Sequence, residues 1–170
     1  DDAGDLDVPD DDVLGSIACR ATDEGYDVVL VSADKDLMQL VTPHVSLYHT
    51  GRDKLYGPAE VEEDFGVPPE KVVDVLALMG DSIDNIPGVP GIGEKGAKGL
   101  IKEYGSLEEL LARAGEVSRK AYREGLTEHA DQARLSRELS TIQVDCDIPF
   151  DPEALHHDPL AGQTGAQAER

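Results

Sequence analysis

The chain has 170 residues, of which 39% are hydrophobic and 30% charged, which is typical of one globular unit and too short for a second large domain. Its apolar runs are too short to cross a membrane. The formal net charge of −21 excludes a protein that holds nucleic acid through an overall positive field, so any such contact is expected to be local.

Charge is unevenly spread along the chain. Between Glu94 and Glu124 there are seven basic and six acidic residues, so this window carries +1 and the remainder carries −22. The two cysteines, Cys19 and Cys146, are far apart and form neither a disulfide framework nor a zinc-binding spacing. This cysteine usage is typical of the reducing cytoplasm.

The first half of the chain alternates helical and strand patterns. Residues 1–9 read as an acidic tail, and apolar positions from Asp12 recur at helical spacing until Gly25. The aliphatic run from Asp27 to Ser32 predicts a strand buried on both faces of a parallel sheet. This rhythm indicates an α/β fold. Further expected elements are a short helix at residues 35–41 and strands at residues 45–49 and 55–56.

The second half of the chain is helical in pattern. A segment rich in glycine and proline, residues 86–93, interrupts it, and Ser106-Leu-Glu-Glu109 is a capping-box pattern that opens a helix. Residues 151–170 lack periodicity, which predicts a linker or a flexible tail. The remaining expected helices are Ala59 to Phe65, Pro69 to Met79, Glu94 to Tyr104 and Glu128 to Ile142.

Six aspartates stand where a metal site could form. The second pair follows the carboxyl end of the expected buried strand, where open parallel sheets build their sites, and the third pair has the spacing of one face of a helical turn. Six converging carboxylates would require cations, and Mg²⁺ or Mn²⁺ prefers such oxygen ligands. Two ions roughly 4 Å apart would suit phosphodiester hydrolysis. The pairs are Asp11 with Asp12, Asp34 with Asp36, and Asp81 with Asp84.

Each pair also has a purely structural interpretation. The first pair could cap a helix and interact with its dipole. Asp34 could cap the short helix, and Asp81 and Asp84 could be turn residues. Their occurrence together with the next motif favours the metal site.

The segment "IPGVPGIGEKGAKGLI", residues 86–101, is the most specific motif. Its glycines permit a tight hairpin without side chains between backbone amides and a phosphate, and the following helix points free N–H groups into that hairpin. Lysines at positions i, i+3 and i+7 of that helix form a basic stripe. The sequence thus predicts a phosphate grip that reads no bases. Its candidate DNA-binding residues are Gly88, Val89, Gly91, Ile92, Gly93, Lys95, Lys98 and Lys102.

Alternative roles for these glycines fit the sequence less well. An ordinary helix-turn-helix corner would also use glycines for close packing. A P-loop is excluded because its Gly-x4-Gly-Lys-Ser/Thr order is absent, and a dinucleotide site would need a strand leading into the glycines. The basic stripe favours DNA.

Four ordered segments carry a family resemblance that covers about Asp11 to Phe150. They are "DDVLGSIA", "SADKDLMQLV", "LMGDSIDNIPGVPGIGEKGAKGLI" and "YGSLEELL". In this order they resemble the 5'-3' exonuclease domain of bacterial DNA polymerase I and its flap endonuclease relatives. The resemblance implies part of a PIN-like parallel-sheet nuclease core at residues 10–82 and an all-helical, SAM-like helix-hairpin-helix subdomain at residues 83–150.

The resemblance also implies a function. In this family the six aspartates match positions that hold two divalent ions, with Asp34, Asp36, Asp81 and Asp84 as catalytic positions. Residues 88–98 match the helix-hairpin-helix that binds duplex DNA, often with a K⁺ ion on backbone carbonyls. The implied substrates are 5' flaps and nicked or gapped duplexes, and the implied setting is DNA replication and repair.

Two departures from the family pattern bear on activity. Pro9 stands where the family has a metal-binding Glu, and the family's first strand and basic arch have no counterpart in this sequence. We therefore expect cleavage to need an upstream segment, in the same polypeptide or as a partner, and a polymerase domain is a further candidate partner. The alternatives are a non-catalytic helix-hairpin-helix DNA-binding module and an acidic interaction domain.

Overall fold

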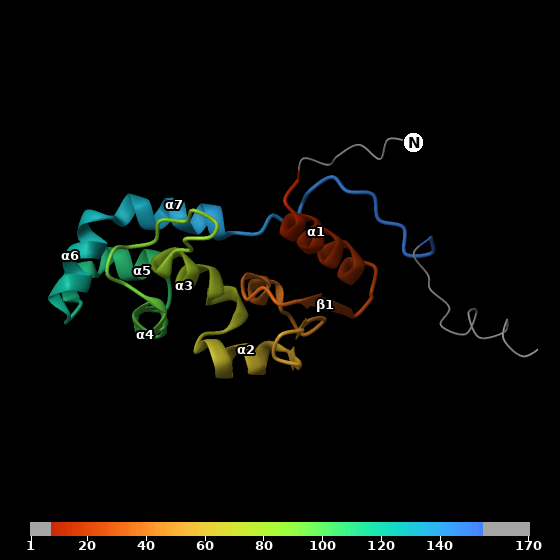
Figure 1. Ribbon diagram of the computed structural model, residues 1–170, viewed down its shortest axis with the longest axis horizontal. Helices are drawn as coiled ribbons and strands as arrows, with labels where there is room; N and C mark the ends of the chain where they lie inside the picture. Colours follow the sequence, from red (N-terminus) through yellow and green to blue (C-terminus); the bar gives the residue numbers. More distant parts are fainter. Residues whose placement is uncertain (1–7, 155–170) are drawn as a thin grey trace, which may run out of the picture.

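The computed structural model describes residues 8–154, so the tails expected at residues 1–9 and 151–170 lie largely outside the described residues (Figure 1). Within 8–154, no helix is both long enough and apolar enough to span a bilayer. In chain order the elements are α1 (Asp10–Asp23), β1 (Val28–Ser32), η1 (Asp36–Leu40), β2 (Val45–His49), β3 (Lys54–Tyr56), α2 (Pro58–Phe65), η2 (Pro69–Lys71), α3 (Val72–Met79), α4 (Glu94–Tyr104), α5 (Leu107–Ala112), η3 (Ala114–Glu116), α6 (Lys120–Glu128) and α7 (Ala130–Ser140).

The sheet has the strand order β1-β2-β3. β1 pairs in parallel with β2, beginning with Val28 opposite Val45, and β2 pairs in antiparallel with β3, with Leu47 opposite Tyr56. The short 3-10 helix η1 connects the two parallel strands. Leu30, Leu47 and Tyr56 point into the core. The strand–helix–strand arrangement expected from the sequence is therefore confirmed.

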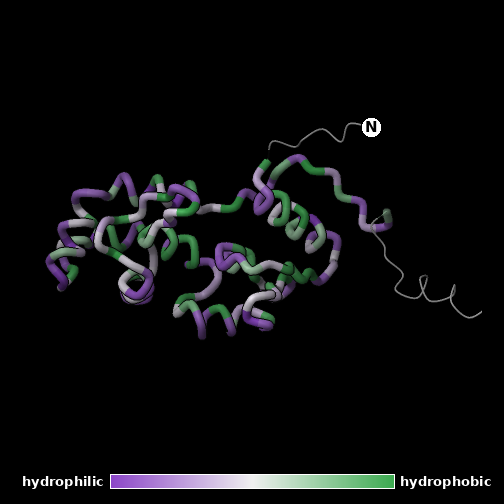
Figure 2. The backbone as a smooth tube through the Cα atoms, viewed as in Figure 1, coloured by the Kyte–Doolittle hydropathy of each residue, from purple (hydrophilic) through white to green (hydrophobic). Residues whose placement is uncertain are grey.

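The expectation that β1 is buried on both faces is wrong. Its first four residues are all aliphatic, and at the place of β1 the tube in Figure 2 is mostly green. Leu30 is buried, but Val29 and Val31 on the opposite face are 56% and 64% exposed, and the neighbouring Leu55 of β3 is 52% exposed. Among the described residues β1 pairs only with β2, so its other edge is open. Hydrophobicity predicted the strand, but nothing in residues 8–154 covers its outer face.

Helix α3 is the centre of the molecule. Every residue from Val72 to Leu78 is buried, including the charged Asp74 at 3% exposure. Arg137 of α7 donates its Nε–H to Asp74 Oδ1 at 2.6 Å, and the backbone N–H of Leu107 donates to the second carboxylate oxygen at 3.3 Å. A buried charge is costly without such partners, so this pair fixes α5 and α7 on α3.

The helix expected from about Glu128 to Ile142 is confirmed as α7, which is shorter at both ends, and an unexpected helix, α6, precedes it. Helix α6 was not predicted from the sequence, because this helix buries only Leu126 and contains Gly125. It therefore lacks an apolar stripe. Gly125 packs instead against the hairpin, where an added Cβ would lie 3.3 Å from Pro90 O. Helix α7 ends at Ser140 because the following backbone is extended and is bound by side chains from elsewhere.

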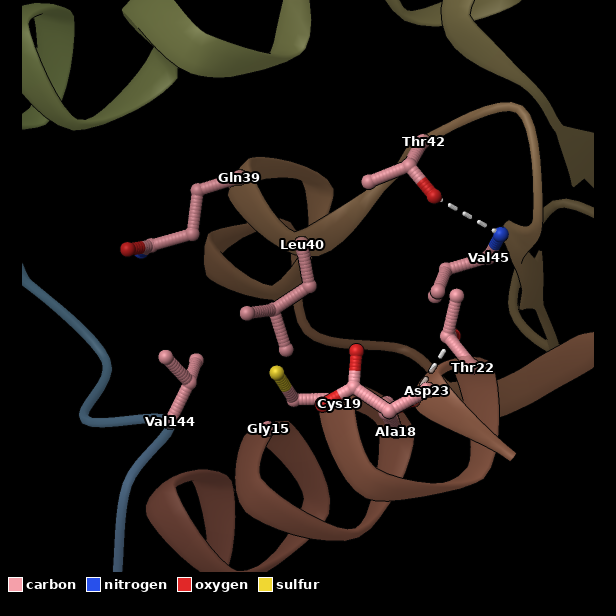
Figure 3. A pocket seen from close by; sticks show the side chains of 10 residues that line it. All are labelled: Gly15, Ala18, Cys19, Thr22, Asp23, Gln39, Leu40, Thr42, Val45 and Val144. Carbon is pink, nitrogen blue, oxygen red and sulfur yellow. Dashed lines mark hydrogen bonds between the residues drawn. The ribbon is translucent and has the colours of Figure 1, made fainter. Parts of the chain in front are cut away.

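Residues 141–150, here called the strap, run from the end of α7 back along α1 (Figure 1). Gln39 of η1 donates its side-chain amide to Ser140 O at 2.9 Å and accepts from the N–H of Ile142 at 3.1 Å. The hydroxyl of Ser16 on α1 accepts from the N–H of Cys146 at 3.1 Å, and Arg20 donates to the carbonyl of Cys146 at 2.9 Å. Figure 3 shows Gln39 at the edge of a small pocket between α1 and η1, on the same side as Val144 of the strap.

Candidate metal centre and nucleic-acid interface

The fold brings the three aspartate pairs to one place from three elements. Asp34 and Asp36 follow the end of β1, and the first pair opens α1. Asp81 and Asp84 follow the end of α3, where Gly80 turns the chain with φ of +68°. Five of the six aspartates that sequence spacing singled out, all except Asp81, therefore line one hollow, and Asp81 lies beside it.

The hollow is a cavity of about 510 Å³ that has carboxylates on one side. Oxygen atoms of Asp36, Asp81 and Asp84 all lie within 4.8 Å of one another, which is a group able to hold a divalent metal ion. The other three aspartates do not join this tight group among the described residues, but they line the cavity beside it.

The electrostatics of the cavity favour a bound cation. Burial, reinforced first by the Asp34 carboxylate, raises the pKa of Asp36 to about 6. Its Oδ1 atom is buried and has no hydrogen-bond partner in the described residues. Burial also raises the pKa of Asp11, with Asp34 adding to the effect. A divalent ion would relieve both costs, so the donor set fits such an ion.

Asp81 differs from its neighbours. The backbone N–H of Ile83 holds the pKa of Asp81 below its usual range, and Lys35 adds to this at 3.6 Å from Asp81 Oδ2. The carboxylate of Asp81 is therefore charged well into the acidic range, while Asp36 beside it holds its proton longer. Lys35 was not singled out from the sequence, although it lies between the two aspartates that follow β1.

The capping and turn roles considered for the aspartates are observed for Asp34 and Asp81, each through one carboxylate oxygen. Asp34 Oδ1 accepts the N–H of Asp36, and Asp81 Oδ1 accepts the N–H of Ile83, both at 2.8 Å. Within residues 8–154 no side chain caps α1, whose N-cap is Pro9, so capping does not explain the first pair. A turn role thus uses one oxygen of each carboxylate, and the second oxygen of Asp81 faces Lys35.

The opposite wall of the cavity was not predicted from the sequence. It consists of residues 138–143, at the end of α7 and the start of the strap. The hydroxyl of Ser140 is buried there and has no hydrogen-bond partner in the described part of the chain, and Glu138 adds a carboxylate. The N–H of Gln143 donates to Asp12 Oδ1 at 2.8 Å. These residues lie about a hundred positions from β1, so no local pattern could indicate them. Pro9 also lines the cavity.

The hairpin forms where its glycines predicted it. Gly88 and Gly91 have positive φ of +62° and +83°, and the N–H of Ile92 donates to Val89 O at 3.1 Å. Val89 and Ile92 are buried, so these side chains anchor the hairpin while Gly91 and Gly93 are exposed at its surface.

Helix α7 holds the hairpin from behind. The N–H of Gly88 donates to Ser136 Oγ at 3.0 Å, and its carbonyl accepts from Gln132 Nε2 at 2.8 Å. Both polar backbone groups of Gly88 are therefore engaged within the protein. The role of Gly88 is to form the turn, whereas the exposed amides lie further along the hairpin.

Two glycines join the hairpin to the aspartate loop. A Cβ at Gly80 would lie 2.6 Å from Ile86 O, and one at Gly88 would lie 2.6 Å from Gly80 N. Asp81 and Ile86 exchange backbone hydrogen bonds across the same loop at 2.7 and 2.9 Å. The carboxylates of the loop and the hairpin are consequently parts of one rigid unit.

The three lysines of α4 are not equivalent. Lys98 pairs with Glu94 at 2.7 Å and lies 4.3 Å over the ring of Phe65, so it is half-buried. Lys95 and Lys102 are exposed, and neither forms an ion pair within residues 8–154. The basic stripe is therefore weaker than its spacing predicts.

Fold and site together define a small α/β core whose acidic cavity adjoins a helix-hairpin-helix subdomain. Two family models match the chain: the N-terminal resolvase-like domain of 5'-3' exonucleases at residues 8–66, and their C-terminal SAM fold at residues 67–163. The chain therefore belongs to the 5'-3' exonuclease family. This agrees with the family resemblance and the fold class inferred from the sequence.

Relatives and solved structures support the same family. The chain is 47% identical to a DNA polymerase I of Rhizobium leguminosarum over 89% of its own length and 15% of that protein's. It is 43% identical to a DNA polymerase I of Bacillus subtilis over 86% of its length and 17% of that protein's. A structure of phage T5 5'-exonuclease with divalent zinc ions superposes with a TM-score of 0.73 at 26% identity, over 80% of this chain and 51% of that one.

A phage T5 flap endonuclease, solved as a pseudo-enzyme-product complex with DNA and metal ions, superposes with a TM-score of 0.70 at 26% identity. The superposition covers 81% of this chain and 50% of that enzyme. The chain thus spans about half of the phage enzymes and about a sixth of the polymerases.

Proposed function

We propose that this chain supplies the metal ligands and the DNA clamp of a 5'-3' exonuclease or flap endonuclease, which hydrolyses DNA phosphodiesters in replication and repair. The observation that carries the proposal is the approach of oxygen atoms of Asp36, Asp81 and Asp84 to within 4.8 Å of one another, with the buried Asp36 Oδ1 lacking a hydrogen-bond partner in residues 8–154. The phage T5 structures named with divalent ions and with DNA support it.

The carboxylates would divide between two ions. Asp36, Asp81 and Asp84 would hold the first, and the remaining three aspartates, which line the cavity beside this group, would contribute to the second. Mg²⁺ or Mn²⁺ suits this set because it consists of oxygen ligands. When bound, such ions supply an activated water and stabilise the charge that develops on the leaving oxygen.

The protein's own residues position the substrate. The exposed amides at Gly91 and Gly93, with Lys95, would bind duplex phosphates without reading the bases. Because Gly80 and Gly88 interlock, the bound phosphates would stand at a fixed distance from Asp81 and its loop. The proposed substrates are 5' flaps and nicked or gapped duplexes, which present a duplex next to the scissile bond.

We also propose that a further strand from an upstream segment packs on β1. Its open edge and the exposed Val29 and Val31 offer backbone hydrogen-bonding groups and apolar area for such a strand. The relatives named DNA polymerase I make a polymerase domain a candidate partner in the same polypeptide.

Metal binding tests the carboxylate cluster directly. In a Mn²⁺ titration of the chain followed by electron paramagnetic resonance, Asp36→Asn is expected to weaken binding at least about tenfold, because lost outer-shell groups already cost 10–100-fold. Asp23→Asn, at the other end of α1 and outside the cavity, is the matched control. Equal affinities for the two variants would refute the cluster.

Cleavage tests the function. With an upstream segment of a relative joined before Asp1, Mg²⁺-dependent cutting of a 5'-flap substrate is expected to appear, and Asp34→Asn or Asp81→Asn should abolish it. Activity that survives in both variants contradicts the proposed roles. Duplex binding with no cleavage under any metal would contradict the nuclease proposal itself.

A further inference from the structure

A second positively charged feature lies beside the hairpin. Between α4 and α6 is a groove of about 270 Å³, here called the α4–α6 groove. Gly96 and Gly99 of α4 form one side, and Arg119 and Tyr122 form the other. Neither Arg119 nor Tyr122 lies in the four segments that carry the family resemblance.

The glycines keep the groove open. A Cβ at Gly99 would meet no atom within 4 Å, whereas a Cβ at Gly96 would lie 2.5 Å from the hydroxyl of Tyr122. The Tyr122 hydroxyl therefore rests on the bare backbone at Gly96, and the space over Gly99 stays free. Glycine lowers helix stability relative to alanine, so two glycines in one helix are a cost that a use of the open space would explain.

The cation in the groove is preorganised. The guanidinium of Arg119 lies 4.2 Å over the ring of Tyr122 and donates to its hydroxyl at 2.8 Å. No ion pair within residues 8–154 involves Arg119 or Lys95, whereas Lys120 pairs with Glu124 at 3.6 Å. A stacked guanidinium keeps its remaining N–H donors fixed for an anion. Among the residues that line the groove, Glu103 is the acidic one.

The groove is continuous with the hairpin. Lys95 lines it and lies in the first turn of α4, two residues after Gly93. On the other side, Gly125 of α6 packs against the hairpin, where an added Cβ would lie 3.4 Å from Val89 Cγ1. A strand gripped at the hairpin would therefore reach the groove without leaving the surface of the same unit.

We infer that the α4–α6 groove binds the sugar–phosphate backbone of the DNA strand next to the hairpin, with Arg119 and Lys95 contacting its phosphates. The inference rests on the proposed function, because it extends the DNA contact beyond the hairpin. Charge favours this occupant, since the window from Glu94 to Glu124 carries +1 in a chain of −21, and two of its cations without an ion pair in residues 8–154, Lys95 and Arg119, line the groove. A polyanion is repelled elsewhere and attracted here.

The test is the salt dependence of DNA binding by the full 170-residue chain. Affinity for a fluorescent nicked duplex is measured by anisotropy over a series of KCl concentrations. Arg119→Gln is expected to reduce the slope of log affinity against log salt by about 0.9, the value for one lost duplex phosphate contact. Arg119→Lys, which keeps the charge, should restore most of the slope.

The control is Arg113→Gln, in the same subdomain but paired with Glu116 at 2.7 Å, and it should leave the slope unchanged. Gly99→Glu fills the groove with a carboxylate and should weaken binding, whereas the isosteric Gly99→Gln should weaken it less. Urea unfolding of each variant separates these effects from loss of fold.

The outcomes distinguish the two proposals. If the wild-type chain fails to bind duplex DNA, the proposed function and the groove both fail. If it binds and Arg119→Gln has the wild-type slope, the groove alone fails. Preference for a polyglutamate peptide over DNA, lost in Arg119→Gln, would also overturn the DNA assignment, because it would make the groove a protein-docking site.

Discussion

The carboxyl of Asp36 links the metal site to stability. Its pKa of about 6 in the folded protein lies above the ordinary value of 3.8, so folding favours the protonated form. The resulting stabilisation is complete below about pH 4 and is lost as pH rises through about 6. For the metal-free chain in EDTA, we expect the free energy of unfolding to fall over that interval by less than the roughly 3 kcal/mol that such a shift carries in a fully buried group, because solvent screens a partly exposed carboxyl.

Other carboxyls act in the opposite direction, because the pKa of Asp81 and of Asp64 is lowered in the folded state. The measurement is therefore the difference in urea stability between the wild type and Asp36→Asn at each pH. Above pH 6 the variant should become more stable relative to the wild type. Saturating Mn²⁺ should make the wild type the more stable of the two. A pH-independent difference would contradict the assignment of Asp36.

Gly88 is fixed by its surroundings as well as by its positive φ. Alanine there would place Cβ 2.6 Å from Gly80 N and 2.7 Å from the carbonyl carbon of Met79. Because these are backbone atoms that cannot swing away, we expect Gly88→Ala to cost at least about 2 kcal/mol through strain and overpacking. Gly99→Ala, at an open helical position, should instead stabilise by up to about 1 kcal/mol. Similar urea midpoints for the two variants would argue against the interlock.

Single residues were predictable where their chemistry is local. Aspartates after a strand and glycines before a helix carry their signal in a few neighbouring positions, so Asp36 and Gly91 were found from the sequence. Ser140 and Gln39 were not, because their meaning depends on a contact between segments about a hundred positions apart. The same holds for the burial that raises the pKa of Asp36.

At the scale of elements, the strap links the two halves of the chain. Gln39→Ala would leave Ser140 O and the N–H of Ile142 without partners in a partly buried position. We expect this variant to lose roughly 2 kcal/mol, since each unsatisfied group costs about 1–3 kcal/mol before relaxation and hydration. Faster hydrogen exchange at the Ile142 amide would show that the loss is in the strap.

Gln143→Ala is the control for that experiment, because only the backbone of Gln143 takes part in the strap contacts. It should leave both stability and exchange close to the wild type. Equal loss in the two variants would mean that Gln39 acts through something other than the strap.

Elements with strong periodicity were predicted, and those held by tertiary contacts were not. The range Glu94 to Tyr104 agrees with α4 because its apolar spacing and Gly105 stop are local signals. Helix α6 has a nearly polar surface and depends on the hairpin it packs against. For β1, hydrophobicity predicted a strand but could not say which face another element covers.

At the scale of the whole molecule, the acidic charge sets two opposite responses to salt. With 36 acidic and 15 basic residues, the folded chain is destabilised by self-repulsion that ions screen. DNA binding, in contrast, depends on attraction between the local basic surface and phosphate, which the same ions weaken. We therefore expect KCl to raise the stability of the fold while it lowers the affinity for duplex DNA.

This opposition is measurable in one series from about 0.05 to 1 M KCl, over which the screening length falls from more than 10 Å to about 3 Å. The urea midpoint should rise with salt at pH 7 and become insensitive near the isoelectric point of 4.3, where self-repulsion vanishes. A specific salt effect on hydrophobic burial would persist at both pH values, so a rise of equal size at pH 4.3 would contradict the charge argument. Because salt stabilises the fold while it weakens binding, a loss of DNA binding at high salt cannot come from unfolding. The slope of log affinity against log salt then counts phosphate contacts alone.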